Sequence, residues 1–328
     1  MKKLSFLSVS ALLFIASCQK ADAPPSDALP PEEVAISAPG SRQCASMEVL
    51  EQQISADPAR GKRLEEIEAF TQKAISSGMS RFVGDIMEIP VVVHVLYKTA
   101  AENISDAQVA SQIDVLNEDF KNQNADASKV PLHFKDEQTS MPIRFVLSQT
   151  IRKATSKKSW GTNDAMKKTS LGGSDPINPS TKLNMWACNL GQGLLGYAQF
   201  PGGPLATDGV VVLFSAFGSR AKAAGTYVGN YDLGRTATHE VGHWLNMRHI
   251  WGDATCGSDL VDDTPQHNTS NGGCPAADSR STCAGTPLEM WMNYMDYTYD
   301  ACMYMFTNGQ KTRAMAVFAV GGPRASFR

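Results

Sequence analysis

Residues 238–249 read Thr-His-Glu-Val-Gly-His-Trp-Leu-Asn-Met-Arg-His, with His239 and His243 four positions apart and Glu240 directly after the first histidine. Side chains at this spacing share one face of a helix, so both imidazoles can bind the same metal ion. Glu240 lies beside them as a candidate general base. The stretch therefore predicts a helix that carries a zinc site together with its own catalytic base.

Two histidines leave this site one ligand short, because catalytic zinc usually has three protein ligands and a water molecule in the fourth position. His249 is the obvious third ligand, yet a continuous helix would place it about 15 Å along the axis from His239. The helix must therefore end near Asn246. Asparagine is among the few residues besides glycine that tolerate the left-handed turn required there.

The N-terminus carries an export signal. An apolar run from Leu4 to Ala16 follows Met-Lys-Lys, and positions 15–18 read Ile-Ala-Ser-Cys. Residues 1–17 predict a lipoprotein signal peptide, with cleavage before Cys18 and a lipid attached to that cysteine. An ordinary signal peptide beside an incidental cysteine is the alternative. We expect an exported bacterial lipoprotein, anchored at the periplasmic or cell surface and open to release by later processing.

The composition indicates a globular protein behind a flexible spacer. Residues 18–43 are rich in Pro, Ala, Ser and acids, which predicts disorder. The 328 residues are 42% hydrophobic and 19% charged, enough for a sizeable core. Without Lys2 and Lys3, the 30 basic and 33 acidic residues leave a mature charge of about −5. No basic tract indicates a nucleic-acid partner, and we expect a monomer.

The predicted elements indicate an α/β (α+β) domain over residues 89–328. A helical pattern covers residues 58–77, ahead of a strand whose His94 is expected in the core. Ser105 and Gln108 form a predicted capping box at the start of the next helix. Strands are predicted at 89–97, 143–147, 183–187 and 209–214.

Seven cysteines become six once Cys18 is assigned to the lipid, an even number in an oxidising compartment. Four of them lie after the histidine motif, in a stretch with few apolar residues: Cys256, Cys274, Cys283 and Cys302. Two disulfides there would stabilise a loop-rich region, although spacing leaves three pairings open. Cys44 and Cys188 remain.

Several segments outside the histidine motif resemble the pappalysin family of metzincin metalloproteases, and most closely its ulilysin-like bacterial members. They are Leu-Gly-Tyr-Ala-Gln-Phe-Pro at 195–201, Val-Asp-Asp-Thr-Pro at 261–265, Asn-Tyr-Met-Asp-Tyr at 293–297 and the four late cysteines. The resemblance extends from about Cys44 to the C-terminus. It implies a metzincin-type zincin with a twisted mixed sheet, a backing helix, an active-site helix and a loop-rich, disulfide-stapled C-terminal subdomain.

The resemblance also implies roles for individual residues. Met295 becomes the methionine of the tight turn beneath the zinc, although methionine also fills core gaps readily. Tyr297 becomes the residue whose hydroxyl stabilises the tetrahedral intermediate, with an ordinary buried tyrosine as the alternative. The implied disulfides are Cys256–Cys283 and Cys274–Cys302. An oxygen-rich loop near the family's calcium region contains Asp259, Asp262, Asp263 and Thr264, and a solvated acidic loop is the alternative.

The segment Arg42-Gln43-Cys44 resembles the pro-segment motif whose cysteine caps the zinc in latent family members. Residues 44–88 would then form a pro-segment, and its removal should raise activity. A Cys44–Cys188 disulfide is the competing interpretation. Some members prefer a basic residue after the scissile bond, with help from an acid near the last cysteine. Ala301 precedes Cys302 in this sequence, which puts that preference in doubt.

The resulting prediction is a secreted, lipid-anchored zinc endopeptidase, made as a zymogen, that cleaves proteins or peptides through a zinc-bound water. Glu240 takes the proton of that water as general base. A zinc-binding surface lipoprotein without significant proteolytic activity is the alternative function. A hydrolase with a distant glutamate as third zinc ligand is a further one, which His249 argues against.

Overall fold

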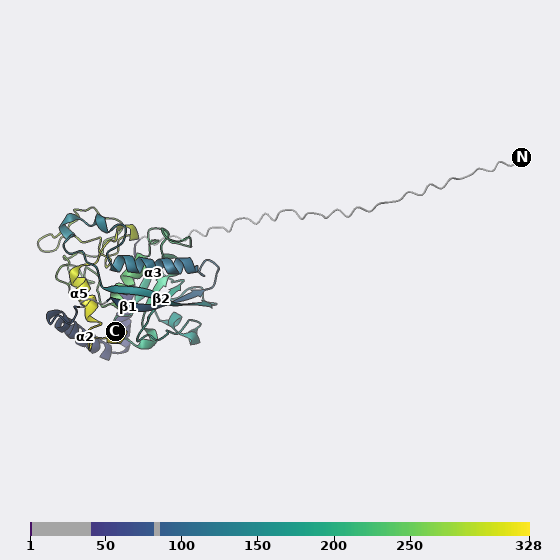
Figure 1. Ribbon diagram of the computed structural model, residues 1–328, viewed down its shortest axis with the longest axis horizontal. Helices are drawn as coiled ribbons and strands as arrows, with labels where there is room; N and C mark the ends of the chain where they lie inside the picture. The colour runs from purple at the N-terminus through teal and green to yellow at the C-terminus, as the bar shows by residue number, and fades with distance from the viewer. Residues whose placement is uncertain (2–40, 82–85) are drawn as a thin grey trace. The chain divides into compact units, whose positions relative to one another are not determined.

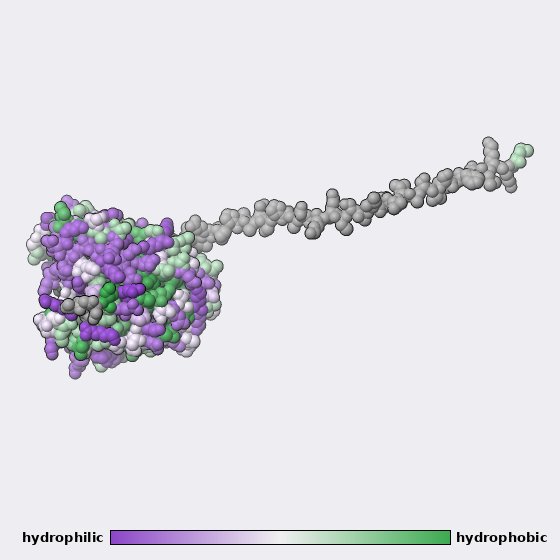
Figure 2. All heavy atoms as spheres, in the orientation of Figure 1, coloured by the Kyte–Doolittle hydropathy of each residue, from purple (hydrophilic) through white to green (hydrophobic). Residues whose placement is uncertain are grey.

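The computed structural model describes residues 1, 41–81 and 86–328, and those from 41 onward belong to one compact unit. The predicted signal peptide, Cys18 and the spacer up to residue 40 lie outside the described residues. Within the described part, no helix combines the length and the apolar character needed to cross a bilayer. Polar residues cover most of the face of the folded part seen in Figure 2, and apolar residues form only small groups on it.

A five-stranded mixed sheet forms the centre of the fold, with strand order β2-β1-β3-β5-β4. The strands are β1 (Met87–Tyr97), β2 (Ile143–Ala154), β3 (Leu183–Cys188), β4 (Gly196–Ala198) and β5 (Val210–Leu213). Neighbouring strands are parallel except at one edge, where β4 runs antiparallel to β5. This edge strand lies next to helix α4 (Arg235–Trp244), which carries the histidine motif, so it forms one side of the predicted site.

The strand predictions hold for β1, β3 and β5, end too early for β2 and miss β4, a buried strand of three residues. Burial on both faces explains the apolar runs of β1, β3 and β5. His94 lies in this core as expected, fully buried between Ser174 and Asn184 and stacked on Trp186. The β2 strand continues to Ala154, beyond the predicted end at residue 147. The sequence did not reveal this second half because it lies at the edge of the sheet, is largely exposed and has no apolar run.

Helix α3 (Asp106–Phe120) is the predicted backing helix and lies across the sheet in Figure 1. Ser105 caps it by accepting a hydrogen bond from the Gln108 backbone N–H at 3.1 Å. The predicted reciprocal half of the capping box is wrong. The Gln108 side-chain amide donates instead to the carbonyls of Phe217 and Thr226, because burial against that loop supplies unpaired acceptors.

Two helices precede the sheet. The sequence predicts α2 (Ala59–Ser76) and misses α1 (Ser46–Ala56), which buries only Ser46 and Val49 and so has little apolar periodicity. Helix α2 packs beside α5 (Asn308–Ala316), as Figure 1 shows. In the described residues, short 3₁₀ turns lie at 127–129, 132–134, 165–167, 169–171, 205–207, 214–216, 300–302 and 325–327.

The metal helix α4 (Arg235–Trp244) ends where the sequence predicts. Asn246 has a φ of 71°, in the left-handed region. The Asn246 and Met247 N–H groups bond to the carbonyls of His243 and Gly242, which is the hydrogen-bond pattern of a Schellman motif. The chain therefore leaves the helix axis and can return toward it at His249.

The region after His249 is loop-rich and crossed by two disulfides. They join Cys256 to Cys283 and Cys274 to Cys302, the pairs that the resemblance implies. This region supplies the segment 293–297 beneath α4. The predicted architecture of mixed sheet, backing helix, active-site helix and disulfide-stapled C-terminal part is confirmed.

Candidate metal centre

Three histidine rings converge on one point beside α4. The Nε2 atom of His243 lies 3.2 Å from Nε2 of His239 and 3.1 Å from Nε2 of His249. The Cys44 sulfur completes the group, in which all ligand atoms lie within 4.8 Å of one another. All four residues are buried, and among the described residues this is the one group of three or more His, Cys, Asp or Glu ligand atoms.

The hydrogen bonds of the three rings show that this donor set fits a metal. Each Nδ1 faces an oxygen: the Tyr294 carbonyl at 2.7 Å from His239, the Met247 carbonyl at 2.9 Å from His243 and the Asp253 carboxylate at 2.5 Å from His249. These acceptors require the proton on Nδ1 and leave each Nε2 lone pair free.

The charge state of the histidines agrees with this assignment. Burial, and then the neighbouring histidines, lower the pKa of His239 and His243 well below the ordinary value, so both rings are neutral. Three unprotonated nitrogens then face one another without a hydrogen between them. Two nitrogens bound tetrahedrally to one zinc ion would lie about 3.3 Å apart, close to the observed spacing.

Glu240 points into the same site from the helix. Ser46 Oγ donates to its Oε2 at 2.9 Å, and the Cys44 thiol lies 3.3 Å from the same oxygen. Burial raises the pKa of Glu240 to about 8, although these two hydrogen bonds oppose the rise. Gly196 makes room for this carboxylate, because a Cβ there would come within 2.9 Å of it. Sequence reasoning missed this role of Gly196.

Met295 is fully buried beneath the metal helix, where the resemblance places it. A Cβ on Gly242 would lie 2.4 Å from the Met295 sulfur, so the glycine inside the histidine motif allows the contact. The side-chain oxygen of Asn293 accepts a hydrogen bond from the Met295 N–H at 2.9 Å. The methionine is therefore held against the centre of the helix.

Tyr297 lies beside the histidine cluster. Its ring centroid is 5.0 Å from that of His249 and 5.7 Å from that of His239. Its hydroxyl donates to the Cys44 carbonyl oxygen at 3.2 Å. Burial is the main reason why its pKa is raised, so the hydroxyl keeps its proton. Tyr297 is thus a hydrogen-bond donor to a peptide carbonyl inside the site.

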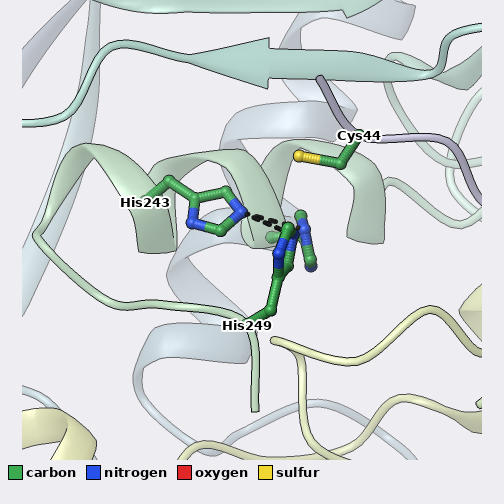
Figure 3. A group of neighbouring side chains, drawn as sticks. Cys44, His243 and His249 are labelled. Atoms are coloured by element: carbon green, nitrogen blue, oxygen red, sulfur yellow. Dashed lines mark hydrogen bonds between the residues drawn. The ribbon is translucent and has the colours of Figure 1, made fainter. Parts of the chain in front are cut away.

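Residues 43–46 fill the cleft between this cluster and the edge strand β4. Cys44 forms a parallel bridge with Gly196, and Ser46 Oγ accepts from the Ala198 N–H at 2.8 Å. Figure 3 shows the Cys44 thiol reaching from this segment toward the rings of His243 and His249. The alternative Cys44–Cys188 disulfide is wrong: both cysteines are free, and Cys188 is buried at the end of β3.

A second anchor of the same segment lies two residues earlier. Arg42 is 1% exposed, and its Nη2 lies 2.7 Å from Asp300 Oδ1. Its guanidinium also donates to Thr236 Oγ1 at 3.0 Å and lies 5.1 Å from the centre of the Tyr231 ring. Asp300 directly precedes Ala301, the residue on which the doubt over basic specificity rested, and it is the carboxylate that binds this guanidinium.

The structure does not bring the predicted calcium residues together. Asp259 accepts hydrogen bonds from Val261 N–H and Thr264 Oγ1, whereas Asp262 is exposed. Asp263 turns to the start of α5, where it accepts from Thr307 Oγ1 at 2.6 Å and Gly309 N–H at 2.7 Å. Helix N-termini attract carboxylates in this way. Calcium binding stays a prediction, and Asp259 with Thr264 is the pair in contact.

The comparisons with known proteins agree with this geometry. The peptidase M43 family model, described as pregnancy-associated plasma protein-A, matches residues 183–319. An extracellular metalloprotease of Arthroderma otae is 30% identical over 278 residues, covering 84% of this chain and 93% of its own. Extracellular metalloprotease 1 of Coccidioides posadasii is 33% identical over 245 residues, with coverages of 71% and 77%.

Two solved structures of a Tannerella forsythia protein are similar over most of the fold. A promirolysin mutant is 41% identical with a TM-score of 0.78, and the match covers 87% of this chain and 97% of that one. Mature mirolysin in complex with a cleaved peptide is 44% identical with a TM-score of 0.71, with coverages of 74% and 96%. The pro-form thus matches the larger share of this chain.

These likenesses extend over the sheet, the metal helix and the C-terminal region, and the relatives in question are metalloproteases. They confirm the family and the metzincin fold expected from the sequence. The chain is a metalloprotease and belongs to the pappalysin family of metzincins.

Proposed function

We propose that this metalloprotease is a zinc endopeptidase, exported with a lipid anchor and made in a latent form. The observation that carries the proposal is the convergence of three imidazole Nε2 atoms and one thiol beside a buried glutamate. His239, His243 and His249 would hold the zinc. The retained Glu240 argues for catalysis over the alternative of a binding lipoprotein, because a structural site needs no base.

Zinc held by the three histidines would supply Lewis-acid chemistry toward the scissile carbonyl and a bound water. Glu240 would accept the proton of the attacking water and deliver it to the leaving amine. Its pKa of about 8 describes a carboxyl that is buried and far from bulk water. A bound dication would lower this pKa and leave the base ionised at neutral pH.

Tyr297 would stabilise the charge that develops on the substrate carbonyl oxygen. Its hydroxyl already donates to a peptide carbonyl in the cleft, that of Cys44. A substrate carbonyl in that position would receive the same hydrogen bond, which strengthens as the oxygen becomes negative. Met295 supports the metal helix from below and takes no direct part.

The edge strand β4 would bind the substrate backbone by strand addition. Its outer groups are paired with the N-terminal segment in the structure: Leu195 N–H donates to the Gln43 carbonyl at 2.9 Å, and Ala45 N–H to the Gly196 carbonyl at 3.1 Å. A substrate must displace this segment to use them. Cleavage therefore depends on whether the substrate backbone can adopt an extended conformation along β4.

The same segment accounts for latency. Cys44 would replace the catalytic water at the metal, because a thiolate is a good zinc ligand. Ser46 occupies the oxygen of Glu240 that the water would use. The similarity to promirolysin, which covers more of this chain than mature mirolysin does, supports residues 44–88 as a pro-segment.

The pocket around Asp300 favours a basic side chain in the substrate. Asp300 is fully buried, and its second oxygen accepts from the backbone N–H groups of Leu233 and Arg235, so its carboxylate is fixed. Arg42 occupies the pocket in the latent form with a charge-assisted hydrogen bond and a cation–π contact. An arginine or lysine of a peptide would replace it after removal of the segment.

Export through the signal at 1–17 agrees with the relatives, which are extracellular metalloproteases, whereas attachment at Cys18 rests on the sequence alone. We expect the lipid to hold the folded part to a membrane surface, with a spacer that ends before Arg42, because Arg42 and Gln43 bind to the fold. Labelling cells with a palmitate analogue would mark the wild-type protein, whereas a Cys18→Ala protein that still carries the label would contradict the anchor.

The test of the function is cleavage of casein and of arginine- or lysine-containing peptides by protein without residues 1–88, as wild type and as Glu240→Ala, each with and without a zinc chelator, because the full-length chain is latent in this proposal. We expect wild-type cleavage that both the chelator and the substitution abolish. Cleavage that survives both would refute the mechanism. Zinc binding without any cleavage would favour the alternative of a binding lipoprotein.

A further inference from the structure

A buried carboxylate packs against the first turns of the metal helix. Asp119 is on the backing helix α3 and is 2% exposed. Thr238 Oγ1 donates to its Oδ2 at 2.7 Å, and the Tyr294 hydroxyl donates to its Oδ1 at 2.9 Å. Arg235 provides the counter-charge, with its Nε 3.4 Å from Asp119 Oδ2.

The two hydroxyl donors belong to the two segments that fix His239. Thr238 directly precedes His239 on α4. The carbonyl of Tyr294 accepts the hydrogen bond from His239 Nδ1 at 2.7 Å and so sets the orientation of the ring. A single carboxylate therefore holds both the helix turn that carries the ligand and the carbonyl that orients it.

We infer that Asp119 is a positioning residue for the metal centre, acting on His239 through Thr238 and Tyr294. The inference rests on the proposed function, in which His239 binds zinc. Groups that orient ligand histidines typically change metal affinity about 10- to 100-fold when they are removed. Asp119 acts one step further out and touches no metal ligand itself.

The charge of Asp119 suits this role. Burial raises its pKa to about 6, while Arg235 and the two hydroxyl hydrogen bonds oppose the rise, so the group is ionised at neutral pH. An ionised carboxylate accepts on both oxygens. Asparagine has one acceptor oxygen and would lose either the Thr238 or the Tyr294 bond, with little change in side-chain volume.

Asp164 offers a matched control in a different part of the fold. It also pairs with a buried cation, Lys167 Nζ at 2.8 Å, and with a tyrosine hydroxyl, that of Tyr197 at 3.0 Å. It has a φ of 58°, a conformation that asparagine tolerates well. Neither partner bonds to a histidine of the cluster, so Asp164→Asn tests the loss of a buried ion pair alone.

The experiment measures the zinc dissociation constant of full-length protein by competition with a chromophoric chelator, together with the visible spectrum of the cobalt-substituted protein. We expect Asp119→Asn and Tyr294→Phe each to weaken zinc binding about 10-fold and to shift the cobalt bands. Asp164→Asn should leave the affinity within twofold and the spectrum unchanged, even where it lowers the thermal unfolding temperature.

Tyr294→Phe removes one hydroxyl and keeps the orienting carbonyl, so it decides the question if Asp119→Asn does not fold. Wild-type affinity and spectrum in Tyr294→Phe would overturn the inference, and so would an equal loss of affinity in Asp164→Asn. Failure of the wild-type protein to bind zinc at the histidines would instead refute the proposed function, which keeps the two failures distinct.

Discussion

The N-terminal segment is attached to the rest of the fold by two regions of different character. In the cleft, residues 42–46 place a guanidinium, a thiol and a hydroxyl against the groups proposed for catalysis and specificity. Helix α2 instead lies against α5 and reaches the metal helix at the turn after it, where Asn246 Nδ2 donates to Thr71 Oγ1 at 3.3 Å. It is held there by Glu68, which pairs with both terminal nitrogens of Arg313 at 2.9 and 2.6 Å.

The two regions therefore have different roles: the cleft contacts inhibit the enzyme, and the α2 contacts set how tightly the N-terminal segment binds to the fold. The cleft contacts block the reacting groups directly, whereas the α2 contacts involve backbone carbonyls and an ion pair that a substrate does not need. Arg60 and Arg63, for example, donate to the carbonyls of Phe200 and Gly202. Changes in the cleft should therefore alter activity strongly, and changes under α2 should alter mainly how firmly the segment is held.

The largest effect is expected for Cys44→Ala in the full-length protein. Loss of the thiol frees the proposed metal position for water, so the initial rate of peptide cleavage should rise at least about 10-fold. Cys188→Ala is the control, because Cys188 is also a free, buried cysteine but lies at the end of β3. Equal initial rates for wild-type and Cys44→Ala protein would contradict a role for the thiol in latency.

A smaller effect is expected for Ser46→Ala. The substitution removes the hydrogen bond to Glu240 and the acceptor for Ala198 N–H while Cys44 remains, so the initial rate should rise about 3-fold. The double variant with Cys44→Ala should exceed either single variant. A Ser46→Ala rate indistinguishable from wild type would show that the cysteine alone controls the site.

Glu68→Gln should loosen α2 and change activity less than twofold. It leaves the guanidinium of Arg313, a residue 1% exposed, without its counter-charge, which weakens docking by about 1–3 kcal/mol. Limited proteolysis of residues 46–76 should accelerate. Glu65→Gln, on the exposed face of the same helix, should digest like wild type. If Glu68→Gln strongly raised the rate of peptide cleavage without faster proteolysis of residues 46–76, the contacts of α2 would control inhibition, which would contradict the roles given to the two regions.

The smallest effect on activity is expected for His94→Gln, in the sheet away from both regions. Burial lowers the pKa of His94 to about 4 from an ordinary value of 6.5. Between about pH 6.5 and pH 4, His94 is protonated in the unfolded chain and neutral in the folded chain. The free energy of unfolding therefore falls by about 3 kcal/mol as the pH drops through this range.

Urea unfolding of metal-free protein at pH 7, 5.5 and 4 measures this slope. The His94→Gln protein should lose that part of the pH dependence and keep the part due to other groups. Identical slopes in the two proteins would mean that His94 takes up a proton in the folded state.

Local patterns were enough for the metal helix and its end. The spacing of His239, Glu240 and His243 is a property of one helix, and the need to bring His249 back toward it places the break at Asn246. The buried parallel strands were equally visible, because burial on both faces requires an apolar run. The short, polar α1 and the second half of β2 carried no such pattern.

Pairings across long sequence separations were not visible in the same way. The capping-box pattern at Gln108 misled because a loop more than a hundred residues later competes for its amide. Asp263 belonged by pattern to a calcium loop, yet the start of α5 uses its carboxylate. In the first case a distant loop binds the amide, and in the second the carboxylate bonds to Thr307 and Gly309, while calcium binding stays a prediction.

The sequence by itself predicted that three histidines meet with a glutamate beside them, because His239 and His243 share one helix face and the turn at Asn246 lets the chain return to them at His249. Only the tertiary structure decided that Arg42, Cys44 and Ser46 meet Asp300, the histidines and Glu240, and that Asp119 supports His239 from behind. Those contacts join residues more than a hundred positions apart, and packing around one core brings them together.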